Sequence, residues 1–149
     1  MCCEELLASQ QIRGVEATDP SFHLDLEAKP VAAGMARRFV TQHAGDLDAD
    51  GALTLLTSEL VTNGVLHART HLRVGIATGQ DHVMVTVADD DGSGSLVIPP
   101  PDDGRPSGRG LMLVDALASQ WGVFRHRGGK TVWFTLPRTT LAGTGGGAA

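Results

Sequence analysis

The amino-acid sequence predicts an α+β fold, a two-layer α/β sandwich in which helices cover one face of a mostly antiparallel sheet. Two observations support this prediction. Segments with apolar residues at the 3.6-residue spacing of helices occur beside segments in which apolar and polar residues alternate strictly. The alternating segments occur mainly in pairs joined by short turns, as in antiparallel hairpins, so the helices are left to cover the sheet. A chain of 149 residues is long enough for one such domain and too short for two of ordinary size.

The first half of the domain is predicted to contain one strand followed by two helices. Alternation over residues 21–26 predicts a half-buried strand. Pro30 suits the first turn of a helix that ends near Gly45. An acidic loop then offers Asp50 as the N-cap of a second helix, which spans residues 53–68 and carries apolar residues at helical spacing.

The second half is predicted to contain two hairpins separated by a loop and a helix. Alternation around two glycine-containing turns predicts four strands, paired as 71–78 with 83–88 and 121–127 with 131–136. Residues 95–107 are rich in Pro, Asp and Gly, which indicates a long surface loop of the kind that forms binding lids or is disordered. A helix over residues 111–119 follows this loop, with Leu111, Val114, Leu117 and Ala118 on its inward face.

The composition is that of one globular domain with an extension at each end. We expect a variable extension over residues 1–20, the domain over 21–138 and a low-complexity, disordered tail over 139–149. Hydrophobic residues make up 42% of the chain without a run of eighteen, so no membrane-spanning segment is expected. The sequence MCCEELLASQ at the start has neither a basic leader nor an apolar signal core, which favours a cytoplasmic location.

Charge and cysteine content argue against several functions. The formal net charge is -5 and the twelve Lys and Arg residues are scattered, whereas direct nucleic-acid binding depends on clustered cations that neutralise phosphates. Aromatic residues amount to 4%, too few to suggest base-stacking surfaces. Cys2 and Cys3 are adjacent and cannot form a disulfide framework or a zinc site on their own, so we interpret them as incidental thiols.

An unusual polar stripe interrupts the apolar helix over residues 53–68. Glu59, Asn63 and His67 follow one another at intervals of four residues, which places all three along one face. A carboxylate and an amide one turn apart suit a magnesium–phosphate site, because the amide oxygen is a hard ligand and the carboxylate can accept a proton. The same spacing also fits the plain polar side of an amphipathic helix, and a pattern this short does not decide between the two.

A second candidate site follows the strand over residues 83–88. Asp90, Gly92 and Gly94 combine an acceptor carboxylate with two residues that let a flat ring approach the backbone closely. An exocyclic amine such as that of adenine is a natural partner for this carboxylate. Clusters of aspartate and glycine are also the commonest turn chemistry, so a simple turn remains the alternative.

Two further glycine-containing stretches lie nearer the C-terminus. Residues 108–111, Gly-Arg-Gly-Leu, begin a predicted helix, where unpaired N–H groups and the arginine favour an anion. Residues 128–131, Gly-Gly-Lys-Thr, form a tight turn that delivers a threonine hydroxyl to the following strand. Each of these signals is weak when it is taken alone.

Taken together, the four pieces resemble a known family. The stretches ELVTNGVLHA, DDDGSG, GRGLMLVDALASQWG and GGKTVWFTLP occur in the order of the N, G1, G2 and G3 boxes of the GHKL ATP-binding family, which includes gyrase, histidine kinases and MutL. The resemblance covers residues 21–138 and, within the family, points to the small stand-alone anti-sigma factor serine kinases of bacteria. Four boxes in register are specific, because each falls in the structural context that the chemistry requires.

The resemblance implies the Bergerat ATP-binding fold and a role for each matching residue. Asn63 would coordinate Mg²⁺ that bridges the phosphates of ATP, and Glu59 would be the catalytic general base. The other expected nucleotide contacts are His67 at the helix end, Asp90 with Gly92 and Gly94 around adenine, the lid residues Gly108, Arg109, Gly110 and Leu111, and Thr131, whose hydroxyl would support the adenine site.

The function implied by the resemblance is that of an ATP-dependent protein serine/threonine kinase in bacterial transcription regulation. With ATP and Mg²⁺, such a protein phosphorylates a serine of a small anti-sigma factor antagonist protein, binds a sigma factor and forms a homodimer. The alternative is an ATP/ADP-binding regulatory switch with little or no kinase activity. One departure from the family pattern is Gly64, where these kinases more often carry alanine; a glycine loosens a helix unless close packing requires it.

Two rival motifs are not supported. Residues 129–131 resemble the end of a Walker A motif, but its first glycine would fall at Phe124 and no helix is predicted to follow. His67 and His71 have the i, i+4 spacing of a metal site, yet neither a third ligand nor the glutamate of a zinc protease accompanies them. We interpret His71 as a surface residue at the start of a strand.

Overall fold

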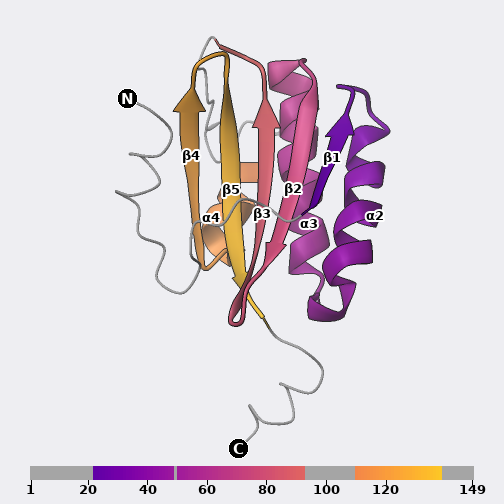
Figure 1. The fold of residues 1–149 in the computed structure, drawn as a ribbon, viewed down its shortest axis with the longest axis vertical. Helices are drawn as coiled ribbons and strands as arrows, with labels where there is room; N and C mark the ends of the chain where they lie inside the picture. The colour runs from indigo at the N-terminus through magenta and orange to yellow at the C-terminus, as the bar shows by residue number, and fades with distance from the viewer. Residues whose placement is uncertain (1–21, 49, 93–109, 139–149) are drawn as a thin grey trace, which may run out of the picture.

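The computed structural model describes residues 22–48, 50–92 and 110–138, and it confirms the predicted α+β class. Its sheet has the strand order β1-β2-β3-β5-β4, and every neighbouring pair is antiparallel. Figure 1 shows α2, α3 and α4 together on one face of this sheet. In chain order the elements are β1 (Phe22–Leu26), α2 (Ala32–Ala44), η1 (Gly45–Leu47), α3 (Ala52–Asn63), η2 (Gly64–Ala68), β2 (Leu72–Thr78), β3 (His82–Asp89), α4 (Gly110–Leu117), β4 (Gln120–His126) and β5 (Gly129–Pro137).

Some predictions fall on residues outside these ranges. The N-terminal extension over 1–20, the loop over 95–107 and the tail over 139–149 lie outside the described residues, as do Gly94, Gly108 and Arg109. The division into extension, domain and tail therefore stays a prediction.

Period-two alternation places the core between the sheet and the helices. Val83, Val85 and Val87 of β3 are buried, and they pair in register with residues of β5 that are buried as well. Burial of one such apolar side chain stabilises the fold by about 1.5–3 kcal/mol. The largest fully buried side chains include Phe134, Leu53, Leu56, Leu72 and Ile76.

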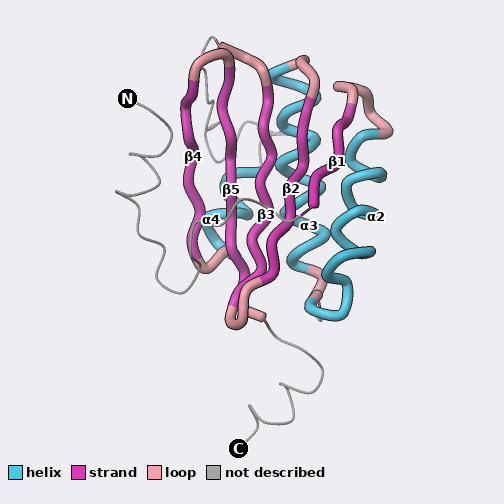
Figure 2. Tube along the Cα trace, in the orientation of Figure 1, coloured by secondary structure: helices cyan, strands magenta, loops and turns pink. Residues whose placement is uncertain are grey.

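The predicted hairpins are present, and their turns lie at opposite ends of the sheet (Figure 2). The β2–β3 turn is closed by a hydrogen bond of 2.7 Å from the amide of Gly79 to the carbonyl of His82. The β4–β5 turn contains Gly128 at φ 88°, a backbone conformation that only glycine adopts without strain.

The edge strand β1 is held to β2 by an exposed ion pair. The Nε of Arg73 donates a hydrogen bond of 3.0 Å to the Oδ1 of Asp25, and these two residues are also partners in the strand register. This hydrogen bond, together with the positive charge of Arg73, lowers the pKa of the Asp25 carboxyl below its ordinary value. Next to β1, a hydrogen bond between Lys29 and Glu27 lowers the pKa of the glutamate and raises that of the lysine.

The N-terminus of α3 is capped mainly by Asp48, whereas the sequence predicted Asp50. The residue that precedes the helix is Gly51 at φ 77°, and this left-handed turn brings the Asp48 carboxylate back over the first helical turn. Asp48 accepts hydrogen bonds from the amides of Leu53 at 2.7 Å and Thr54 at 3.3 Å. Asp50 accepts one bond of 3.2 Å, from the amide of Ala52.

The helix predicted over residues 53–68 changes its winding after Asn63. There α3 gives way to the π-helical turn η2, in which the amide of Arg69 bonds the carbonyl of Gly64 at 3.1 Å. Arg69 itself adopts φ 56° and ends the turn. A methyl group on Gly64 would lie 2.8 Å from a terminal carbon of Leu72, so a larger residue here requires the Leu72 side chain to shift.

The helix predicted over residues 111–119 spans Gly110–Leu117. Val114 is fully buried, as expected for its inward face. The prediction that Leu117 faces inward is wrong, because 44% of this residue is exposed. Leu117 is the last residue of α4, and the chain enters β4 at Gln120, so this residue lies at the end of the helix.

Candidate functional site

Three predicted motifs meet at one end of the sheet, where β3 ends and β5 begins (Figure 1). The amide of Asp90 donates a hydrogen bond of 2.9 Å to the Oγ1 of Thr70, which follows η2. A Cβ added to Gly92 would lie 3.8 Å from the Cα of Gly128 in the β4–β5 turn. The segment that follows η2, the aspartate-rich segment and the glycine turn therefore form one corner of the molecule.

Glu59 and Asn63 provide a carboxylate and an amide one helical turn apart on α3. Both residues are half-buried. Within the part of the chain that the structure describes, neither side chain forms a hydrogen bond or an ion pair. An amide oxygen and a carboxylate without competing partners fit the donor set that Mg²⁺ and a phosphate-bearing ligand require.

His67 lies in η2 and is exposed. The sequence placed it on the same stripe as Glu59 and Asn63. The wider winding of the π-turn rotates His67 away from its α-helical position, because four residues no longer complete a turn. Contact between His67 and a nucleotide stays a prediction.

Asp90 follows the last residue of β3, and its carboxylate is exposed. No described side chain pairs with this carboxylate. Gly92 is likewise exposed, next to the β4–β5 turn. These positions suit an acceptor for a ligand amine, and the assignment of Asp90 to adenine stays a prediction.

Gly110 and Leu111 are the first two residues of α4, so the predicted helix start is confirmed to within one residue. Helix α4 packs against α3, the helix that carries Glu59 and Asn63. The amide groups of the first turn of α4 are therefore on the helix layer that borders the site. Contact between these amide groups and phosphate stays a prediction.

Thr131 lies on the opposite face of β5 from the helices. Val132 and Phe134 point into the core, and the side chains of a strand alternate. The Oγ1 of Thr131 is 3.3 Å from the Nε2 of His126 on β4. The helix-facing position at this end of β5 belongs to Lys130, and the support of adenine by Thr131 stays a prediction.

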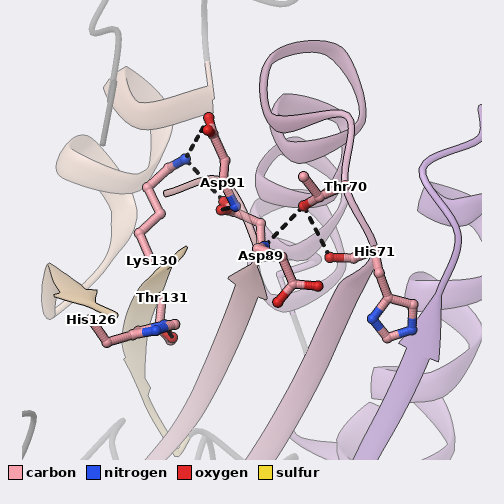
Figure 3. Close-up of polar contacts among 8 residues, drawn as sticks. Thr70, His71, Asp89, Asp91, His126, Lys130 and Thr131 are labelled. Carbon is pink, nitrogen blue, oxygen red and sulfur yellow. Dashed lines mark hydrogen bonds and ion pairs between the residues drawn. The ribbon is translucent and has the colours of Figure 1, made fainter. Parts of the chain in front are cut away.

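Lys130 and Asp89 were not among the residues that the sequence indicated as functional. Figure 3 shows the ammonium group of Lys130 between the carboxylates of Asp89 and Asp91. The Nζ of Lys130 is 3.0 Å from the Oδ2 of Asp89 and 4.0 Å from the Oδ2 of Asp91. Lys130 and Asp89 are 5% and 6% exposed. Extending the alternation of the buried residues by one step along each strand places both residues on the helix-facing side, but it does not show that they pair.

The described residues contain no group of three His, Cys, Asp or Glu side chains arranged to hold a metal ion. Coordination of Mg²⁺ by the Asn63 amide stays a prediction. None of the described helices is long and apolar enough to cross a lipid bilayer.

An antiparallel sheet covered by helices on one face, with a carboxylate–amide pair and a glycine-rich corner at one end, defines the GHKL class of ATP-binding domain. A profile of the histidine kinase-like ATPase domain matches residues 24–136. The chain belongs to this family, which confirms the resemblance drawn from the four boxes. The name of the family implies that ATP is the nucleotide bound.

A solved structure shares this fold. The RsbU and RsbW domains of Rv1364c from Mycobacterium tuberculosis align over 84% of this chain with 23% identity and a TM-score of 0.57. This chain spans about a third of the length of that one, since the alignment covers 34% of it. The histidine kinase domain from the Erythrobacter litoralis EL346 blue-light activated histidine kinase aligns over 90% of this chain and 70% of its own, with 19% identity and a TM-score of 0.48. A comparison with curated proteins finds no match.

Proposed function

We propose that this protein is an ATP-dependent protein serine kinase that regulates a sigma factor. It would transfer the γ-phosphoryl group of ATP to a serine of a small anti-sigma factor antagonist protein. The main observation behind the proposal is the pair of Glu59 and Asn63, which lie one helical turn apart on α3. Both residues are half-buried, and their side chains have no partner in the described chain. The domain that holds them belongs to an ATPase family.

A small number of residues is enough for this reaction, because phosphoryl transfer depends mainly on positioning the reactants and on neutralising charge. Mg²⁺, when bound, supplies positive charge to the phosphates. Asn63 would hold the ion through its amide oxygen. Glu59 would accept the proton of the attacking serine hydroxyl, and Asp90 would accept a hydrogen bond from the adenine amine.

The proposed partners are a sigma factor and its anti-sigma factor antagonist, with the kinase acting as a homodimer in the cytoplasm. Two observations support these partners. The four boxes resemble those of anti-sigma factor serine kinases, and the fold is similar to that of a protein described by its RsbW domain.

The first test is calorimetric titration of the purified protein with ATP in the presence and absence of Mg²⁺, beside Asn63→Ala and Asp90→Asn. Loss of one bond to a charged or polar ligand group costs about 1.5–3 kcal/mol, which corresponds to roughly a 10- to 100-fold rise in Kd. Gln80→Ala is the matched control, because Gln80 is exposed in the β2–β3 turn at the other end of the sheet. Binding by the wild-type protein that neither site variant weakens would contradict the assigned site.

A second measurement separates the kinase from the regulatory switch. Radioactive phosphate transfer from γ-labelled ATP to purified antagonist proteins is compared for the wild type and Glu59→Ala. The kinase proposal expects transfer by the wild type, and loss of transfer in the variant with ATP binding retained. Tight ATP binding without transfer to any antagonist would favour the ATP/ADP-binding switch. Failure of the wild-type protein to bind ATP would refute both functions.

A further inference from the structure

Lys130 is buried at the point where the nucleotide-binding end of β3 meets β5. It is the direct register partner of Asp89, the last residue of β3. Burial of an ammonium group is costly unless a charged partner compensates it. Asp89 provides that partner at 3.0 Å, and Asp91 adds a second carboxylate at 4.0 Å.

The carboxylate of Asp89 also fixes the backbone that follows it. Its Oδ2 contacts Lys130, while its Oδ1 accepts a hydrogen bond of 2.9 Å from the amide of Asp91. Thr70 holds the amide of Asp90 from the other side at 2.9 Å. A Cβ at Gly129 would overlap the carbonyl oxygen of Asp89, so the two strands approach as closely as their backbones permit.

These contacts distinguish Asp90 from the residues on each side of it. Asp89 and Asp91 are turned toward Lys130, and Asp90 is left exposed with no side-chain partner in the described chain. Three consecutive carboxylates would repel a polyanionic nucleotide, and the ammonium of Lys130 offsets part of this charge. Because that ammonium is buried and already paired, it is not free to contact phosphate itself.

We propose that Lys130 is a positioning residue of the nucleotide site: through its ion pair with Asp89 it fixes the Asp90–Gly92 segment in the geometry that binds the nucleotide base. This inference rests on the proposed function, because it assumes that the segment binds ATP. It assigns to Lys130 an effect on affinity that is exerted through Asp89 and not by direct contact.

The test compares ATP–Mg²⁺ affinity by calorimetry in the wild type, Lys130→Met, and the double variant Asp89→Asn/Lys130→Met. The single variant leaves the Asp89 carboxylate buried without its cation, so the segment should shift and Kd should rise by roughly tenfold or more, equivalent to about 1.4 kcal/mol. In the double variant the buried Asp89 carboxylate is replaced by a neutral amide, so only the more exposed Asp91 loses a cation, and the amide oxygen of the substituted side chain can still accept the bond from the backbone N–H of Asp91. Most of the lost affinity should therefore return.

Leu136→Ala is the matched control, because Leu136 is a buried residue at the opposite end of the same strand, paired with Val83. It should destabilise the fold while leaving Kd within about twofold of the wild type, a difference of about 0.4 kcal/mol, at a temperature where circular dichroism shows each variant folded. Amide exchange of the nucleotide-free protein gives a second readout. Lys130→Met should accelerate exchange at Asp91 and leave Val85 protected.

The outcomes separate this inference from the proposed function. If the wild type binds ATP and Lys130→Met binds equally well, or if its Asp91 amide stays protected, the positioning role is refuted and the proposed function stands. If the double variant stays as weak as Lys130→Met, Lys130 acts on the nucleotide directly and the proposed route through Asp89 is refuted. If the wild type does not bind ATP, both the proposed function and this inference are refuted.

Discussion

Gly64 lies at the junction of α3 and η2, directly against the side chain of Leu72 on β2. A methyl group at this position would come within 2.8 Å of one terminal carbon of Leu72 and 3.2 Å of the other. Leu72 is fully buried, so any shift of its side chain must be accommodated inside the core. This packing explains a glycine at a helical position where alanine would be the better helix former.

We expect Gly64→Ala to lower the free energy of unfolding. Alanine gains about 1 kcal/mol in helix propensity, whereas overpacking of a filled core costs about 1–3 kcal/mol. Urea denaturation measures the balance. The variant Gly64→Ala/Leu72→Val has no δ-carbons at residue 72, which removes both atoms that collide, and should recover stability relative to Gly64→Ala. A single variant more stable than the wild type would show that Leu72 yields easily and that the glycine is not required by packing.

Single residues also show which parts of the candidate site a sequence pattern can indicate. Glu59 and Asn63 were found because both lie on one helix, where a spacing of four residues is enough to place them together. Asp89 and Lys130 are far apart in the sequence and meet only because β3 and β5 pair in one particular register. No local pattern in the sequence specifies that register.

At the scale of elements, the start of α3 depends on a carboxylate that lies outside the helix. Asp48 binds two backbone amides and the hydroxyl of Thr54 at 2.9 Å, although it precedes the helix by several residues. The left-handed turn at Gly51 makes this reach possible.

We expect Asp48→Ala to lower the free energy of unfolding by about 1–2 kcal/mol, at the upper end of the range for a lost N-cap. Asp50→Ala is the matched control, because Asp50 accepts a single longer bond and its loss should cost less. Thermal or urea unfolding of the two variants gives the comparison. Equal effects would indicate that the two aspartates share the capping role.

The existence and order of the described elements could be predicted, whereas their ends could not. Hairpins follow from alternation and turn residues, because both signals are local. The end of α3 at Asn63 is different, since the helical spacing of apolar residues continues past it to Leu66. The same limit applies to Leu117, whose exposure follows from where the chain turns into β4.

At the scale of the whole molecule, one core joins the sheet to all three described α-helices. Leu56 lies at its centre, fully buried on the inner face of α3. The same helix carries Glu59 and Asn63 on its polar side. Stability of the core and the position of the candidate site therefore depend on one element.

We expect Leu56→Ala to cost about 2–5 kcal/mol, the range for deletion of a buried leucine side chain. Unfolding should remain a single transition, with far-ultraviolet circular dichroism and tryptophan fluorescence giving coincident curves. Trp121 and Trp133 report on the β4–β5 side of the sheet, away from α2. Separate transitions for the two probes would show that the helix layer and the sheet unfold independently.

The turn between β2 and β3 lies at the far end of the sheet from Lys130. The main chain of Arg138 is hydrogen-bonded to the carbonyl of Asp81 in this turn, and its guanidinium reaches the carbonyl of Gly79. The eight residues of β3 separate the turn from the site by about 25 Å. A protein carrying Gln80→Cys, with Cys2 and Cys3 replaced by serine, could be attached to a sensor surface through this turn. The nucleotide end would then face the solution, so small ligands and protein partners could be captured from the same immobilised molecule.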